Sequence, residues 1–88
     1  MFEKKIRVLY VRTYNFVNEK TGESVTGSKV SYHFLEPTNS DNEKGFRVEF
    51  GNLSLDTGKK IMNKLPYECI AKFELSNDSK LKLVAISE

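Results

Sequence analysis

The sequence predicts an all-β domain in which five strands curl into a small barrel that carries one short helix. Several segments alternate apolar and polar residues with the period of two expected of a half-buried strand, and they are rich in β-branched and aromatic side chains. Only one segment spaces its apolar residues as a helix does. The 88 residues are enough for one domain only, which is expected to span residues 1–88. A domain of this length has a thin core.

The first strand is expected over residues 5–17, which are mostly β-branched or aromatic. At about 3.3 Å per residue, a straight strand of this length would exceed about 40 Å and would not fit so small a domain. The strand must therefore bend. The apolar phase supports a bend, because Leu9 and Val11 have the opposite parity to Val8 and Tyr10.

A turn that ends with Gly22 at positive φ leads into a second strand over residues 24–36. In this strand Val30, Tyr32 and Phe34 alternate with polar residues, which favours a core-facing row. Gly27 is expected to mark a bulge near the start of the strand.

Residues 37–44 form a polar surface loop before the third strand, expected over residues 45–50. Its alternation predicts that three apolar side chains face the core, namely Phe46, Val48 and Phe50. Arg47 and Glu49 are then expected to face outward.

The single helix is expected over about residues 57–65, with Asp56 as its N-cap and Pro66 as its stop. Two further strands follow, joined by a turn at residues 77–79. The expected order is three strands, one helix and two strands. A helix between strands three and four is the arrangement of the five-stranded OB barrel. A small SH3-like barrel and a split β-sheet sandwich are the competing architectures.

The charge and cysteine content limit the classes of partner. The net charge is only +2, so nucleic acid is permitted but not demanded by composition. The one cysteine, Cys69, has no partner for an internal disulfide. No stretch has the roughly 20 apolar residues that a membrane-spanning helix needs. We therefore expect a cytoplasmic protein with no membrane partner.

Catalysis and cofactor binding are not expected. His33 is the one histidine, and no serine or cysteine stands at a spacing that suggests a catalytic pairing with it. We interpret His33 as a solvent-facing strand residue and Cys69 as a small core residue. No phosphate-binding glycine motif or metal-ligand cluster is present in the sequence.

Basic and aromatic residues are interleaved along the first three expected strands, and all three arginines fall there. Unpaired nucleic acid is bound by cations that contact its backbone and by aromatic rings that stack on its bases. The candidate nucleic-acid-binding residues are Arg7, Arg12, Tyr14, Lys20, Lys29, Tyr32, His33 and Arg47. Two alternatives stay open: Tyr32 faces the core, and Lys20 and Lys29 are surface charges that only keep the protein in solution.

Four segments carry a resemblance to a known family: GSKVSY at 27–32, GFRVEF at 45–50, LPYEC at 65–69 and LKLV at 81–84. With its length, they make the chain similar to the gene V family of filamentous-phage single-stranded-DNA-binding proteins. It also resembles the short helix-destabilising proteins of mobile elements in Gram-positive bacteria. The resemblance implies an OB-type barrel that forms a homodimer and coats single strands, with Lys29 and Tyr32 on the DNA and Arg12 beside them. The sequence departs from the family in two ways. Acidic residues, Glu19 and Glu23, flank Lys20 in the first hairpin, and the final hairpin is short.

The leading hypothesis is therefore a sequence-tolerant binder of single-stranded DNA, or of RNA, that protects strands during replication or transfer of a phage or mobile element. It needs no cofactor. The alternative is a small β-barrel protein-interaction module, or a phage structural or regulatory subunit, which the near-neutral charge favours.

Overall fold

The computed structural model describes residues 2–87 and consists mostly of antiparallel β-structure with one short α-helix. A one-turn 3-10 helix, η1, continues directly from that helix. In chain order the elements are β1 (Phe2–Val17), β2 (Ser24–Phe34), β3 (Thr38–Asn39), β4 (Lys44–Gly45), β5 (Glu49–Leu53), α1 (Leu55–Ile61), η1 (Met62–Lys64), β6 (Tyr67–Leu75) and β7 (Leu81–Ile86).

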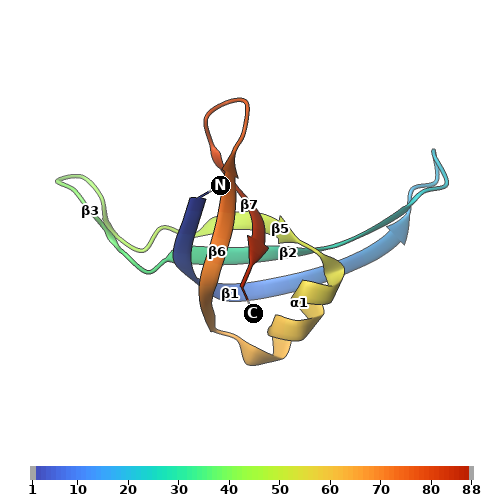
Figure 1. Cartoon of the computed structure of the whole chain (residues 1–88), viewed down its shortest axis with the longest axis horizontal. Coiled ribbons are helices and arrows are strands. Elements are labelled where there is room, and N and C mark those ends of the chain that lie inside the picture. Colours follow the sequence, from blue (N-terminus) through green and yellow to red (C-terminus); the bar gives the residue numbers. More distant parts are fainter. Residues whose placement is uncertain (1, 88) are drawn as a thin grey trace.

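Five strands form one sheet in the order β5-β2-β1-β6-β7, with β1 in the middle paired to both β2 and β6. The sheet curls into a half-barrel, so its two edges approach each other (Figure 1). Leu83 of β7 packs against Gly51 of β5, where an added Cβ would lie 2.8 Å from Leu83 Cδ2. The absence of a side chain at Gly51 therefore lets the edges meet.

The all-β prediction with one short helix is confirmed, but the order of elements differs from the expected one. An additional two-stranded ribbon, β3 with β4, is inserted between the second and third strands of the main sheet. This ribbon and the far end of β1 and β2 project in opposite directions from the half-barrel (Figure 1). The molecule is correspondingly elongated, with extents of 50 × 32 × 24 Å.

The long first strand bends at a register shift. Val8 of β1 pairs with Tyr32, but Tyr10 pairs with Ser31, so Leu9 is an extra residue without a partner of its own in β2. Val8 before the shift is fully buried, and Val11 after it packs against the same core. The predicted change of phase is confirmed. A bulge of this kind turns every later side chain of the strand over to the opposite face.

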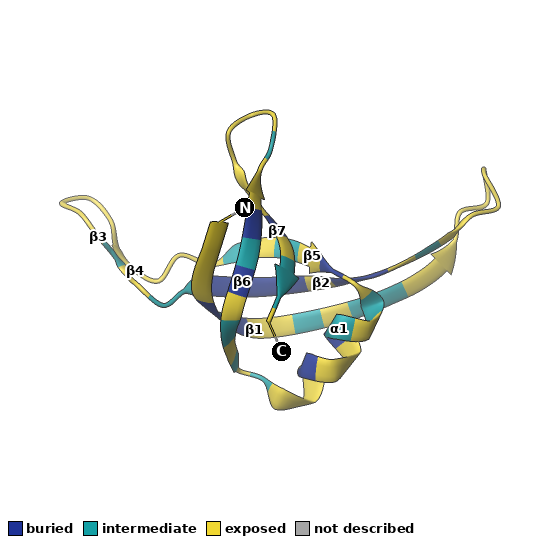
Figure 2. Ribbon diagram, viewed as in Figure 1, coloured by how far each residue is buried: buried dark blue, intermediate teal, exposed yellow. Residues whose placement is uncertain are grey.

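The core lies inside the curl of the sheet, with α1 closing one side (Figure 2). Tyr32 sits at its centre, 5.9 Å between ring centroids from Phe73. The alternation predicted for β2 is confirmed here, because Val30 and Tyr32 are both buried. The buried hydrophobic residues are Ile6, Val8, Val30, Tyr32, Leu53, Ile61, Ala71, Phe73 and Leu83.

The prediction for the third strand is wrong in both position and orientation. The strand in the main sheet is β5, and it begins at Glu49 rather than at residue 45. The three aromatic or apolar residues that were expected to face the core are all exposed, namely Phe46, Val48 and Phe50. The core-facing positions of β5 include Leu53, which is buried, and Gly51, where Leu83 and Tyr32 leave no space for a side chain. Phe50, one residue earlier, therefore faces outward.

The helix begins earlier than predicted, and its N-cap is Ser54 rather than Asp56. The Ser54 hydroxyl oxygen accepts a hydrogen bond from the Thr57 backbone N–H at 3.2 Å. Serine satisfies one of the unpaired N–H groups at a helix start as aspartate would. The Ser54 carbonyl also accepts a hydrogen bond from the Ser28 hydroxyl of β2 at 3.0 Å, which joins the helix start to the inner face of the sheet.

Gly58 is the point at which α1 contacts β2 most closely. A Cβ at this position would lie 2.5 Å from Ser28 Cβ and 3.4 Å from Val11 Cγ1.

We expect Gly58→Ala to lower the free energy of unfolding by about 1–3 kcal/mol through overpacking, although alanine favours a helix interior by about 1 kcal/mol. Urea denaturation measures this. The exposed neighbour Lys59→Ala is the control, expected to lie within about 0.5 kcal/mol of wild type. A Gly58→Ala protein as stable as wild type would contradict the close approach.

Candidate nucleic-acid interface

The sheet presents a face that is turned away from the core and from α1. Residues that lie directly opposite each other on paired strands share a face. Val11 and Ser28 point toward the helix, so their neighbours Arg12 and Lys29 point to the other side. We call the part of this surface that follows the register shift at Leu9 the outer face, which leaves out the outward-facing Arg7 and Glu68 before the shift. Its residues are Tyr10, Arg12, Tyr14 and Phe16 of β1, Val25, Gly27, Lys29 and Ser31 of β2, and Phe50 and Asn52 of β5.

The outer face is built of cross-strand rows of different chemistry. One row has two rings on either side of a hydroxyl, in the order Tyr10, Ser31, Phe50. The next row is cationic and polar, in the order Arg12, Lys29, Asn52. Successive rows lie two residues apart along each strand, which is about 6.6 Å. Aromatic and cationic groups thus alternate along the sheet.

Three rings of this face are exposed to an unusual degree for a small domain. Phe50 is 68% exposed, Phe16 54% and Tyr10 50%. Aromatic rings are normally buried, because removing their large apolar surface from water stabilises the folded state. Exposed rings gathered on one face indicate a binding surface.

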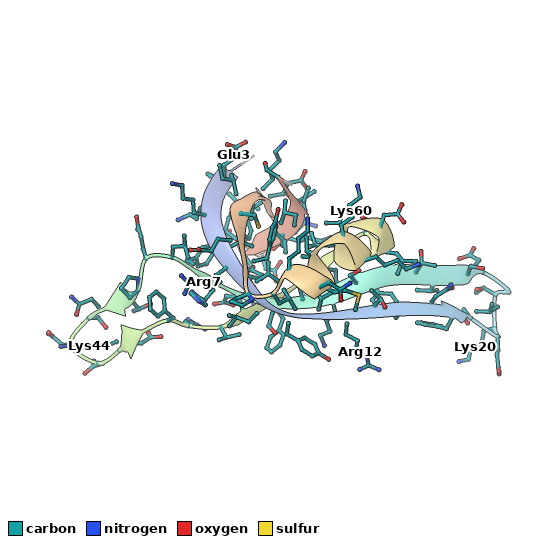
Figure 3. The ribbon with its side chains drawn as sticks, turned by 90° about the horizontal axis from the view of Figure 1, so that it is seen from below. Glu3, Arg7, Arg12, Lys20, Lys44 and Lys60 are labelled. Carbon is teal, nitrogen blue, oxygen red and sulfur yellow. The ribbon has the colours of Figure 1, made fainter. Side chains whose placement is uncertain are left out.

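The two cations of the face have no acidic partner. Arg7 pairs with Glu68 at 3.1 Å and Arg47 with Glu49 at 3.3 Å, but no carboxylate among residues 2–87 pairs with Arg12 or Lys29. Arg12 points away from the sheet on the side opposite α1 (Figure 3). The Lys29 ammonium lies 5.7 Å from the centroid of the Phe50 ring.

Arg12 and Lys29 are direct cross-strand neighbours. Like charges in this position destabilise a sheet, and none of the outer-face residues is acidic to compensate. A local arrangement that opposes folding is typical of a functional surface. The pair is suited to binding an anion, because two guanidinium or ammonium groups close together offer several donors to phosphate oxygens.

Tyr14 lies flat across β2 at Gly27. A Cβ at Gly27 would lie 2.7 Å from Tyr14 Cζ, so only glycine leaves room for the ring. The prediction that Gly27 marks a bulge is wrong, since the register between β1 and β2 shifts only at Leu9. The centroid of the Tyr14 ring is 6.2 Å from that of Phe16, and together the two rings extend the aromatic surface toward the end of the ribbon.

Of the residues predicted to bind nucleic acid, Arg12, Tyr14 and Lys29 come together on the outer face. Lys20 lies at the tip of the β1–β2 ribbon, far from this group (Figure 3). Arg7 and Arg47 are engaged in the ion pairs with Glu68 and Glu49 described above.

Two predicted contact residues are buried. Tyr32 is 3% exposed in the core, where burial and the nearby Glu49 carboxylate raise the pKa of its hydroxyl. The interpretation of His33 as solvent-facing is wrong, since it is 5% exposed beneath the ring of Phe46, 4.7 Å between centroids. Its Nδ1 donates to the Phe34 carbonyl oxygen at 2.8 Å. Neither side chain is accessible to a nucleotide in this structure.

Sequence reasoning missed three rings of the outer face: Tyr10, Phe16 and Phe50. Tyr10 was ambiguous because the strand changes phase nearby, and the position of the extra residue decides its side. The signal for Phe50 was the following Gly51, since a glycine in a strand indicates a close approach of another chain segment. Phe16 lies beyond the core on the projecting ribbon, and nothing in its spacing distinguishes it.

Chemical groups for catalysis are few in the described part of the chain. No group of three or more histidine, cysteine or acidic residues there is placed to hold a metal ion. Cys69 of β6 is half-buried against the core. Burial raises the pKa of its thiol to about 11, so at neutral pH the thiolate that would act as a nucleophile is scarce.

The raised pKa predicts the pH dependence of thiol alkylation. The thiolate is the reactive form, and its fraction in Cys69 grows until the pH passes about 11. The rate of reaction with iodoacetamide is therefore expected to keep rising between pH 9 and pH 10.5, with intact protein mass as the measurement. A short peptide of residues 67–71 is the control, and because its thiol has an ordinary pKa, its rate is expected to rise no more than about twofold over the same range. A plateau near pH 9 in the folded protein would contradict the burial effect.

No protein-family model matches the chain, and no curated protein or solved structure is significantly similar to it. No helix within residues 2–87 has the length and apolar character to cross a membrane.

Gly27→Ala is expected to displace the Tyr14 ring while the sheet stays folded. The added methyl group meets the far end of a flexible side chain, which can turn away. The free energy of unfolding should stay within about 1 kcal/mol of wild type. In two-dimensional NMR spectra the ring signals of Tyr14 and Phe16 should shift strongly, and those of the core residue Ile61 should not. A large loss of stability would show instead that the ring cannot move.

Proposed function

We propose that the protein binds single-stranded DNA without sequence preference, across the outer face of an OB-type barrel. One observation carries the proposal: the unpaired cations Arg12 and Lys29 lie between exposed aromatic rings on a face that has no acidic residue. Cations bind the phosphates of any sequence, and rings stack on any base. Such a surface therefore favours unpaired strands, whose base faces are free, over duplex DNA.

The placement of charge supports this function better than the total charge does. The net charge of +2 gives little overall attraction to a polyanion. Ion pairs and scattered carboxylates offset most of the other cations, for example Arg7 with Glu68. The outer face keeps its two cations uncompensated, so the attraction is concentrated where the rings lie.

The topology supports the OB-type assignment. The first strand of the sheet is central, and the helix lies between the third and fourth strands of the main sheet, β5 and β6. Oligonucleotides bind OB barrels on the face around strands two and three, which here are β2 and β5. These strands carry Lys29, Phe50 and Asn52. The role in replication or transfer of a phage or mobile element, and the homodimer, stay predictions from the family resemblance.

The proposal is tested by fluorescence anisotropy with labelled oligo-dT at two salt concentrations. Wild type should bind at low salt and weaken steeply as salt rises. Arg12→Ala/Lys29→Ala should weaken binding and lower the magnitude of the salt slope by about 1.4, the loss expected for two phosphate contacts on a single strand.

The matched control is Lys59→Ala/Lys64→Ala, which removes two positive charges away from the outer face. Its salt slope should equal that of wild type. Equal losses in the two double variants would show that only net charge matters and would remove the assignment of the site. An oligo-rU of the same length shows whether RNA is bound as well.

A protein-interaction module is the second candidate, favoured by apolar residues at the β6–β7 hairpin. Leu75 and Leu81 pair across this hairpin and are both exposed. Clustered apolar side chains of this kind are typical of a protein contact. No change of anisotropy with oligo-dT at low salt would place this candidate first.

A further inference from the structure

Tyr10, Ser31 and Phe50 form one cross-strand row of the outer face, and we call the space above Ser31, between the two rings, the notch. Tyr10 and Phe50 stand on the two strands that flank β2, each directly opposite Ser31. Neither ring contacts another ring among the described residues, so each keeps free surface. The small side chain of Ser31 therefore lies between two large, exposed aromatic residues.

Ser31 at the floor of the notch has a polar group without a partner. The residue is only 9% exposed, yet its hydroxyl makes no hydrogen bond with any other described residue. No side-chain oxygen or nitrogen in the described chain is both fully buried and unpartnered. The Ser31 hydroxyl therefore keeps its small solvent contact, which on this face is through the notch. A mostly buried hydroxyl without a partner, placed between two exposed rings, indicates a place for a polar ligand edge.

The width of the notch fits one flat ring. Neighbouring strands are about 4.8 Å apart, so the backbones of β1 and β5 at this row are separated by about 10 Å. Stacked bases are about 3.4 Å apart, so a base between two rings needs about 7 Å between the ring planes. The backbone spacing is therefore compatible with one base between the rings and leaves no room for a second.

We propose that Tyr10 and Phe50 enclose one unpaired base between them, with the Ser31 hydroxyl hydrogen-bonded to the edge of that base. This inference rests on the proposed function and identifies the place on the outer face at which a nucleotide is held. The hydroxyl both donates and accepts, so it suits the edges of all four bases. The notch accordingly holds a base without selecting its identity.

The cationic row beside the notch completes the site. Lys29, two residues from Ser31, holds its ammonium 5.7 Å from the Phe50 ring centroid, and Arg12 lies directly opposite Lys29. A phosphate attached to the enclosed nucleotide reaches this pair as the strand runs from the aromatic row to the cationic row. In duplex DNA each base is covered on both faces by its neighbours, so a base enters the notch only after unstacking. The notch thus selects single strands.

A double-mutant cycle tests whether the two rings share one base. Tyr10→Ala and Phe50→Ala should each weaken oligo-dT binding about tenfold. Together they should weaken it by much less than the product of about 100-fold, because a base that has lost one wall gains little from the other. Phe16→Ala is the matched control, being an exposed ring on the same face but outside the notch. The double variant Tyr10→Ala/Phe16→Ala should lose affinity for oligo-dT by the product of the two single losses.

Ser31→Leu tests the notch in a second way, by filling it while every ring and cation stays in place. Binding should weaken about tenfold with the salt slope unchanged, because no phosphate contact is lost. The urea unfolding midpoint checks that the variant folds, and the cycle above does not depend on it.

The outcomes separate this inference from the proposed function. If wild type does not bind oligo-dT, the proposed function itself fails, and the notch with it. A second outcome is that wild type binds and Arg12→Ala/Lys29→Ala weakens binding, but the losses of affinity from Tyr10→Ala and Phe50→Ala multiply fully. The two rings then stack on separate bases. That result overturns the enclosed base and leaves the function standing. Sub-multiplicative losses for this pair, and not for Tyr10 with Phe16, support the notch.

Discussion

The extra residue at Leu9 is the constraint on which the rest of the molecule depends. Before it, Ile6 and Val8 face the core; after it, Val11 does so, although its parity is opposite. An unbroken alternation would have turned Tyr10, Arg12 and Tyr14 toward the interior, where unpaired charge is costly. The shift turns them to solvent instead and also adds local twist to a strand that must curve around the core. One unpaired residue therefore shapes both the half-barrel and its outer face.

The outer face combines two features that oppose folding. Two other cations stand beside carboxylates, Arg7 beside Glu68 and Arg47 beside Glu49, and surface pairs of this kind contribute up to about 1 kcal/mol. Arg12 and Lys29 repel each other across β1 and β2 without an acid nearby. The exposed rings add apolar surface in contact with water. These features oppose folding but suit a ligand that brings negative charge and flat rings together, which is the chemistry of an unpaired polynucleotide.

Glycine positions show how close contacts direct side chains to the outer face. Gly27 leaves space for the Tyr14 ring to lie across β2, and Gly51 leaves space for Leu83 where the sheet edges meet. Because Gly51 occupies an inward position of β5, Phe50 is turned outward. Neither role is visible in the spacing of apolar residues, since both depend on a segment distant in sequence. The same holds for Ser54, whose capping role became clear only when the start of α1 was placed against Ser28.

The sequence by itself determined the all-β character, the single short helix, the inward row of β2 and the bend in the first strand, because these follow from local side-chain periodicity and the limits of a short chain. It also indicated Arg12, Tyr14 and Lys29 as candidates. Only the tertiary structure decided which face each side chain occupies beyond Leu9, that Tyr32 and His33 are buried, and that Phe50 joins Tyr10 across Ser31. The physical reason is that strand side chains alternate with a period of two. A shift of one residue in pairing, which depends on the partner strand, therefore exchanges the two faces.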